Sequence, residues 1–204
     1  MSGTLYLVPA PLDFGCEPPL PALTEVLPLA TLEQMARVDA VVPLSAPLQE
    51  LQMVSLPREV HKKGDHLPVQ HSGSDLPGTV QALLQPALDG HDLALASEAG
   101  IPAVADPGSS VVRAAHAAGV RVVPLVGPSS LLLALAASGL NGQNFAFVGY
   151  LPQDMQNRSK RLQALESLAM RSGQTQLWIE TPYRNQAVFD HALQCLKPET
   201  RLCI

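Results

Sequence analysis

The feature that most constrains the fold is a regular alternation of strand-like and helix-like stretches from Pro77 onward. Each change is marked by glycine, proline or aspartate, which end regular secondary structure. A run such as 120–125 is nearly continuous in apolar residues, as is typical of parallel strands covered on both faces. The sequence therefore predicts an α/β fold, with strands at residues 92–97, 120–125, 144–149, 175–180 and 201–204.

The preceding part of the chain is less regular. Residues 4–9 are predicted to form a short buried strand, and the prolines that follow prevent a regular helix until about Ala22. Residues 31–38 have a helical composition. Because residues 41–71 contain four prolines and a long polar run, we expect a long loop or edge structure there.

Composition limits the class of protein. With 204 residues, of which 47% are hydrophobic and 4% aromatic, the chain can fill a packed core mainly with aliphatic side chains. The net charge of -5 counts against a general nucleic-acid coat, although a local basic patch is compatible with it.

The cysteines and the apolar runs indicate a cytoplasmic protein. The three cysteines, Cys16, Cys195 and Cys203, have neither disulfide-framework nor zinc-site spacing, which indicates a reducing compartment. The start of the chain has no basic export signal, and the apolar run 131–137 is much shorter than the about 20 residues that span a bilayer. We therefore expect no membrane insertion.

Common nucleotide-binding and hydrolase motifs are absent from the sequence. It contains no GxGxxG, GxxxxGK[ST], HExxH or GxSxG. Ligands of parallel α/β sheets usually bind beyond the carboxyl ends of the strands. The loops that begin at Ser97, Val126, Gly149 and Glu180 are therefore the candidate binding segments.

Three of these loops also have a purely structural interpretation. In the segment 97–108, Asp106 is predicted to cap the next helix with Pro107 in its first turn, whereas Gly100 is expected to adopt a positive φ or to admit a ligand. The segment 127–130 (GPSS) is typical of a helix start with serine caps. At the end of another strand, Arg184 could pair with Glu180 at the surface.

Taken in order, the motifs resemble those of the tetrapyrrole methylase superfamily, in particular its branch of small-subunit ribosomal RNA 2′-O-ribose methyltransferases. The resemblance covers residues 93–184 and, more loosely, the first strand and residues 58–66. The matching motifs are 5–11 (LYLVPAP), 97–102 (SEAGIP), 105–108 (ADPG), 127–130 (GPSS), 149–152 (GYLP) and 180–184 (ETPYR).

The resemblance implies two α/β domains with mostly parallel sheets, 1–125 and 126–204, and S-adenosyl-L-methionine bound in a cleft between them. It also implies a homodimer and no metal. Carried over position by position, it assigns cofactor contacts to Glu98, Ala99, Gly100, Ile101, Ser129, Ser130, Tyr150 and Glu180. Family members use largely backbone polar groups for these contacts, which accounts for the small residues.

The sequence departs from the family pattern at three places. The turn at residues 11–15 lacks the glycine-asparagine step of the RNA-modifying branch. The family would place a further charged helix between Arg37 and Val38, and it continues with more sheet after Ile204. The likeness therefore implies an incomplete second domain.

Methyl transfer from a sulfonium needs alignment more than acid–base side chains. No catalytic residue is assigned, although a ribose hydroxyl would benefit from a base, for which Asp13, His61, His66 and His71 are candidates by polarity alone. Two basic groups could contact RNA phosphates: Arg58, His61, Lys62, Lys63 and His66, and Arg158, Lys160 and Arg161.

Three functions therefore remain open. The first is a methyltransferase acting on the ribose 2′-hydroxyl of small-subunit ribosomal RNA. The second is a methylase of a tetrapyrrole or another small molecule, against which the low aromatic content counts. The third is an interaction protein that keeps the fold without turnover.

Overall fold

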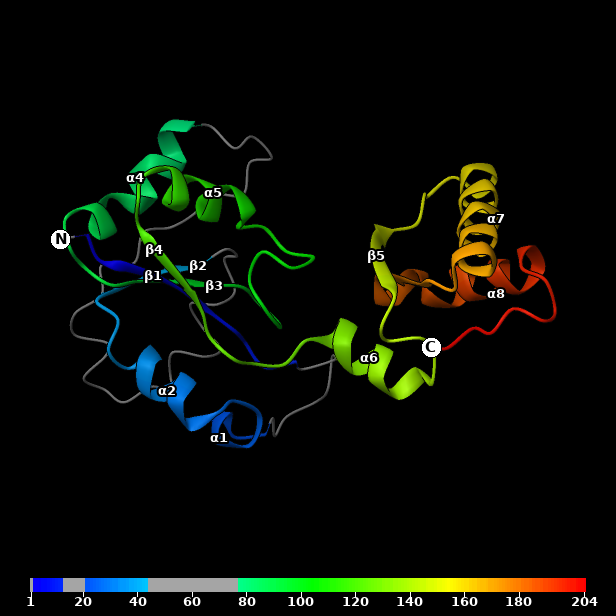
Figure 1. The fold of residues 1–204 in the computed structure, drawn as a ribbon, viewed down its shortest axis with the longest axis horizontal. Coiled ribbons are helices and arrows are strands. Elements are labelled where there is room, and N and C mark those ends of the chain that lie inside the picture. Colours follow the sequence, from blue (N-terminus) through cyan, green and yellow to red (C-terminus); the bar gives the residue numbers. More distant parts are fainter. Residues whose placement is uncertain (1, 13–20, 44–76) are drawn as a thin grey trace. The chain divides into compact units, whose positions relative to one another are not determined.

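The computed structural model describes residues 2–12, 21–43 and 77–204, which divide into two compact units (Figure 1). The first unit is Met1–Ser129 and the second is Ser130–Ile204. The domain boundary expected at 125/126 stays a prediction. None of the helices in the described ranges combines the length and the hydropathy that crossing a membrane requires.

The first unit is built on a four-stranded parallel sheet. Its strands are β1 (Thr4–Val8), β2 (Ala40–Pro43), β3 (Leu93–Ala96) and β4 (Arg121–Pro124), in the spatial order β2-β3-β1-β4. Leu5 of β1 lies beside Leu93 of β3 on one side and beside Val122 of β4 on the other. The expectation of parallel strands is confirmed.

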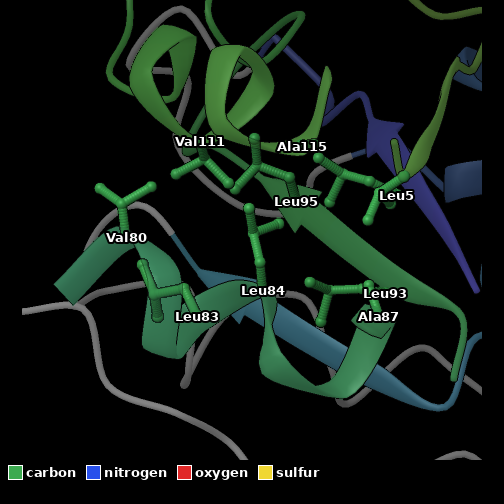
Figure 2. Packing of buried hydrophobic residues seen from close by; sticks show 10 residues of the cluster. Leu5, Val80, Leu83, Leu84, Ala87, Leu93, Leu95, Val111 and Ala115 are labelled. Atoms are coloured by element: carbon green, nitrogen blue, oxygen red, sulfur yellow. The ribbon is translucent and has the colours of Figure 1, made fainter. Parts of the chain in front are cut away.

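Helices cover both faces of this sheet. The helices α4 (Pro77–Leu88) and α5 (Ser109–Ala117) pack on the face that Leu5, Leu93 and Leu95 present, as Figure 2 shows. The opposite face carries Val8 and Ala94, which form a smaller cluster with Val38 and with Met35 of α2 (Leu29–Met35). Successive side chains of a strand point to opposite faces of the sheet. Because both faces are covered, apolar residues are favoured at consecutive positions, which explains the continuous apolar runs.

The edge of the sheet at which the strands begin is closed by backbone–side chain hydrogen bonds. Asp92 accepts a hydrogen bond from the Thr4 N–H at 2.9 Å, and Asp39 accepts one from the Asp92 N–H at 3.0 Å. These carboxylates satisfy the backbone where the strands enter the sheet. The opposite edge, where β1, β3 and β4 end, carries the candidate binding loops.

The second unit contains two parallel strands, β5 (Phe145–Tyr150) and β6 (Thr175–Ile179). The helix α7 (Met155–Ser172) joins them; Asp154 caps its start, accepting from the Asn157 N–H at 2.8 Å, and Gly173 ends it with φ 65°. The remaining helices are α6 (Ser130–Ser138), the 3-10 turn η3 (Pro182–Arg184) and α8 (Asn185–Cys195). Leu162 and Leu165 of α7 pack with Val188 and Ala192 of α8 in the core of this unit.

The predicted strands at 92–97, 120–125, 144–149 and 175–180 are confirmed within two residues at each end. The strand expected at 201–204 is wrong. These residues are irregular, because a strand needs a neighbouring strand for its backbone groups and residues 201–204 pair with none of the described strands. Only Leu202 packs against the core of the second unit, whereas Ile204 is 91% exposed.

The less regular early part of the chain contains three further elements. The helix predicted at 31–38 is α2, which begins at Leu29 and ends before a turn at Ala36, and a short helix, α1 (Leu23–Val26), precedes it. The chain then passes through Arg37 and Val38 directly into β2. As expected for edge structure, β2 is an outer strand, while residues 44–76 lie outside the described ranges.

Candidate functional site

The loop from Ser97 to Gly108, called the β3–α5 loop, is fixed to the segment that follows β1. Gly100 and Ala10 form an isolated antiparallel bridge, in which the Ala10 N–H donates to Gly100 at 2.8 Å and the Gly100 N–H donates back at 3.0 Å. The φ of Gly100 is 71°, so the positive φ expected there is confirmed. The bridge holds the middle of the loop beyond the carboxyl ends of β1 and β3.

Two alanines in this loop adopt left-handed backbone conformations. Ala103 has φ 65° and Ala105 has φ 61°, and residues other than glycine rarely adopt such positive φ angles. The Ala103 N–H donates to the carbonyl of Pro107 at 3.2 Å and helps to hold the turn. Each such residue costs of order 1 kcal/mol, and strain of this kind is concentrated at binding and catalytic sites.

The prediction that Asp106 caps the next helix is wrong. The helix α5 begins at Ser109. Its N-cap residue is Gly108, which has φ 123° and no side chain that could cap the helix. No side chain makes a capping hydrogen bond at this helix start, so the carboxyl of Asp106 does not act as a cap. It lies instead near the hydroxyl of Ser97, at the start of the loop.

Ser97 and Asp106 are a polar pair within an otherwise small and apolar loop. Ser97 is 2% exposed, and its Oγ has no hydrogen bond of ordinary length and angle to any described residue. Burial raises the pKa of Asp106 from its usual value; the nearby Ser97 hydroxyl lowers it in part, and the charge of Glu98 raises it further. Burial is thus the largest influence on the pKa of the Asp106 carboxyl, and the Ser97 hydroxyl offsets it in part.

Four of the residues assigned by resemblance lie together in this loop. Glu98 and Ala99 are exposed, Ile101 is half-buried, and Gly100 is buried beneath the bridge to Ala10. The side chains of Glu98 and Ala99 and the backbone around them are therefore accessible.

The segment after β4 is anchored to the first unit by two contacts. The Thr31 hydroxyl donates to the carbonyl of Val126 at 2.7 Å. Gly127 packs so closely on Pro9 that a Cβ at this position would lie 2.3 Å from two atoms of the proline ring. Ser129 is half-buried, and Ser130 is exposed at the start of α6, where the sequence predicted a helix to begin.

In the second unit, Tyr150 is the last residue of β5, and Glu180 directly follows β6. Tyr150 is 57% exposed and follows Gly149, whose φ of 73° accompanies a register shift between the strands. The Glu180 Oε2 lies 3.2 Å from the Arg184 Nη2, so the predicted pair is confirmed. Its predicted surface location is wrong, because the Glu180 side chain is only 5% exposed.

The Glu180 carboxylate is only partly satisfied. Its Oε1 accepts from the Thr181 N–H at 2.9 Å, whereas its Oε2 and the Arg184 Nη2 lack hydrogen-bond geometry despite their short separation. Glu180 also lines a cavity of about 580 Å³ within the second unit. Leu135, Leu165, Trp178 and Val188 supply much of the apolar lining of that cavity.

The prediction that Arg158 contacts RNA phosphates is wrong. Arg158 is 7% exposed and its Nε donates to the His191 Nδ1 at 2.8 Å. The other ring nitrogen lies 2.9 Å from the Ser159 hydroxyl. A neutral His191 with its proton on Nε2 satisfies both contacts, so this cluster joins α7 to α8. Lys160 and Arg161 of the same helix are exposed.

Several predicted candidates lie outside the described residues. These are Cys16, the possible bases Asp13, His61, His66 and His71, and the basic group Arg58, His61, Lys62, Lys63 and His66. Within the described ranges, no three His, Cys, Asp or Glu side chains are grouped as metal ligands would be.

Sequence comparison finds similarity to proteins named ribosomal RNA small subunit methyltransferase I. The protein of that name from Pseudomonas aeruginosa is 43% identical over 95 residues, which are 47% of this chain and 32% of the relative. The protein from Mesorhizobium japonicum is 36% identical over 135 residues, 66% of this chain and 44% of the relative. The chain thus spans less than half the length of these relatives. No family model matches the sequence.

Two solved structures resemble the fold. The methyltransferase CobJ matches with a TM-score of 0.59 and 19% identity over 97% of this chain and 78% of its own. The conserved hypothetical protein APE0931 from Aeropyrum pernix K1 matches with a TM-score of 0.55 and 22% identity, covering 82% of this chain and 55% of that one. At these identities the likeness establishes the fold alone.

Proposed function

We propose that this chain belongs to the tetrapyrrole methylase superfamily and is an S-adenosylmethionine-dependent methyltransferase that acts on small-subunit ribosomal RNA. The carrying observation is that the identity to relatives with this name reaches 43% over a stretch of 95 residues. The β3–α5 loop supports the proposal, because it is strained, bridged to Ala10 and placed where parallel sheets bind ligands.

The cofactor contacts are part of the proposal. We infer that the backbone of Glu98, Ala99, Gly100 and Ile101 holds the amino-acid end and the ribose of S-adenosylmethionine. Gly100 is well suited to this role, because its bridge to Ala10 sets the loop and its positive φ exposes the neighbouring peptide groups. The resemblance adds four further cofactor contacts to the proposal: Ser129, Ser130, Tyr150 and Glu180. Each can be tested by substituting that residue alone.

The chemistry requires little of the protein beyond alignment. When bound, S-adenosylmethionine supplies a methyl group on a positively charged sulfur, which an incoming oxygen can displace in line. The loop would fix the ligand through backbone groups rather than charged side chains, and a rigid loop limits the entropy lost on binding. The methylated atom is proposed to be a ribose 2′-oxygen. We further propose that the protein works in the cytoplasm as a homodimer.

The test is transfer of a labelled methyl group. The purified chain is incubated with methyl-labelled S-adenosylmethionine and small ribosomal subunits, and the RNA is then hydrolysed with alkali. Label in alkali-resistant dinucleotides is expected, since a methylated 2′-oxygen blocks cleavage at that position. Label in a methylated base would refute the ribose assignment, and label in porphyrinogens alone would favour the small-molecule alternative.

A glycine variant provides the matched control. Gly100→Ala places a Cβ at φ 71° and 3.4 Å from the Leu12 side chain, which should disturb the bridge to Ala10 and reduce transfer at least tenfold, about 1.4 kcal/mol in the barrier. In Gly142→Ala the added Cβ would meet no atom within 4 Å, so this variant should leave methyl transfer unchanged. A chain that binds S-adenosylhomocysteine but transfers no methyl to any acceptor would favour the non-enzymatic alternative.

A further inference from the structure

The second unit has a different charge balance from the chain as a whole. The whole chain carries 13 Lys and Arg against 18 Asp and Glu, whereas residues 130–204 carry seven Lys and Arg against five Asp and Glu. The excess of acids therefore lies in the first unit. Such an uneven distribution of charge favours contact between the basic part and a polyanion, either a nucleic acid or a membrane surface.

The helix α7, yellow to orange in Figure 1, directs one cation and its only acid inward. Arg158 is buried against His191, as described above. Glu166 is also buried, and its carboxylate accepts hydrogen bonds from the Lys197 N–H at 2.8 Å and from the Thr200 hydroxyl. Because this carboxylate is turned toward the segment after α8, the outer face of α7 has no acid of its own.

The three remaining cations of α7 lie on that outer face and are all exposed: Lys160, Arg161 and Arg171, together called the cationic face. Helix geometry places them within a sector of about 100° on the side away from the buried Leu162 and Leu165. Lys160 and Arg171 are separated by about 16 Å along the helix axis. The cationic face is therefore long enough for several phosphates of one nucleic-acid strand.

The cationic face has no ion-pair partner among the described residues. The ion pairs found in that part of the chain join His91 to Asp39 and Arg184 to Glu180. Asp154, the acid that precedes α7, accepts from a backbone N–H as the cap of the helix. The other exposed residues between Lys160 and Arg171 are uncharged: Gln163, Ala164, Ser167, Leu168 and Met170. The positive charge of this surface is thus left for an external partner.

We propose that the cationic face of α7 contacts the phosphates of the RNA substrate. This inference rests on the proposed function. Lys and Arg bind phosphates and release their counterions, and Gln163 and Ser167 offer side chains of the kind that also contact a nucleic-acid backbone. A membrane suits the helix less well, because a helix that lies on a bilayer inserts its apolar side, and the apolar side of α7 is buried in the core of the second unit.

The experiment measures binding of the full chain to labelled small-subunit ribosomal RNA by filter binding at several salt concentrations. The face variant has glutamine at all three positions of the cationic face. The matched control has glutamine in place of three exposed arginines of the first unit, Arg37, Arg113 and Arg121, and so loses the same net charge. The dissociation constant for S-adenosylhomocysteine is measured for the same chains by calorimetry.

The face variant is expected to bind RNA at least tenfold more weakly than the unaltered chain at about 0.1 M salt. Its slope of log affinity against log salt concentration should be shallower by about 2, since each phosphate contact on a single strand contributes about 0.7. The control should bind RNA within about threefold of the unaltered chain, and S-adenosylhomocysteine should bind all three chains equally. Equal RNA affinity of the face variant and the control would overturn the inference.

A charge-conserving variant separates phosphate contact from a structural role. Lys160→Arg, Arg161→Lys and Arg171→Lys in one chain keep the charge and should bind RNA within about threefold of the unaltered chain. Glutamine forms helix about as well as lysine and arginine, so the face variant should also unfold at an unchanged temperature. Loss of binding by the charge-conserving chain, or unfolding of the face variant at a lower temperature together with weaker binding, would refute phosphate contact.

The failure of the inference is distinguishable from that of the proposed function. If the unaltered chain binds RNA and the face variant binds it equally well, only the inference fails. If the unaltered chain binds S-adenosylhomocysteine but no RNA, the RNA substrate fails and the inference with it. Binding of the unaltered chain to phosphatidylserine vesicles that is lost in the face variant, without binding to RNA, would assign the cationic face to a membrane instead.

Discussion

Substitution of Gly127 by alanine should strongly destabilise the first unit. The added Cβ would lie 2.3 Å from the Cβ and Cγ of Pro9, more than 1 Å closer than ordinary contact, and 3.4 Å from the Leu27 side chain. The proline ring cannot rotate away, so the backbone of β1 or of the segment after β4 has to shift. Overpacking of this kind costs about 1–3 kcal/mol.

The assay is urea unfolding followed by far-ultraviolet circular dichroism. Gly142→Ala is the matched control, because its Cβ would meet no atom within 4 Å, and it should change the free energy of unfolding by less than about 1 kcal/mol, toward greater stability. Trp178, the single tryptophan, lies on β6 and reports separately on the second unit by fluorescence. A Gly127→Ala variant as stable as Gly142→Ala would refute the packing argument.

Three further results are expected. His191→Phe keeps an aromatic ring but removes the acceptor for the buried Arg158 Nε, so it should destabilise the second unit by about 1–3 kcal/mol, while Arg161→Leu on the exposed face should not. Equal stability of the two variants would contradict the network. The Glu166 carboxylate accepts hydrogen bonds from the Thr200 hydroxyl, which has the larger effect, and from the Lys197 N–H, and both lower its pKa from 4.5. The stability that this carboxylate contributes is therefore present above pH 4.5 and is lost as the pH falls through the lowered pKa. Glu166→Gln should therefore weaken the dependence of the free energy of unfolding on acidic pH, measured by urea unfolding. An unchanged pH dependence would contradict this role of Glu166. Asp154→Ala removes the cap of α7 and should cost about 1 kcal/mol by thermal unfolding, whereas Asn157→Ala, which keeps the donating N–H, should cost less.

The sequence was informative about the fold where local and tertiary preferences agree. The apolar run that became β3 is buried on both faces, and its composition alone predicts a parallel strand, whereas the equally apolar β4 lies at the edge of the sheet and is only partly buried. The same reasoning failed at 201–204, because an apolar composition does not supply a neighbouring strand. Strand formation depends on pairing, which no single segment encodes.

The candidate site was predictable in position more than in detail. The small residues around Gly100 predicted a positive φ, which its bridge to Ala10 explains. The pairing of Ser97 with Asp106 was missed, because a carboxylate before a helix is usually a cap and the turn at Gly108 could not be foreseen. The left-handed conformations of Ala103 and Ala105 had no signal in the sequence, because asparagine and aspartate, not alanine, are the non-glycine residues that favour a positive φ.

Burial corrected the two charge assignments in the second unit. Arg158 belongs to a basic stretch that is typical of a solvated face, yet its place on α7 directs it to His191. Glu180 and Arg184 have the spacing of a surface pair, but the Glu180 side chain is only 5% exposed. Periodicity alone did not reveal either, because a long polar side chain can lie along an otherwise apolar seam.

The most direct test of the account is titration calorimetry of the purified chain with S-adenosylhomocysteine. The account predicts saturable binding of one molecule per chain with a dissociation constant below about 1 mM, the upper end of ordinary enzyme–substrate affinities, and weaker binding by Gly100→Ala. Absence of binding at millimolar ligand by a chain that circular dichroism shows to be folded would contradict the central claim.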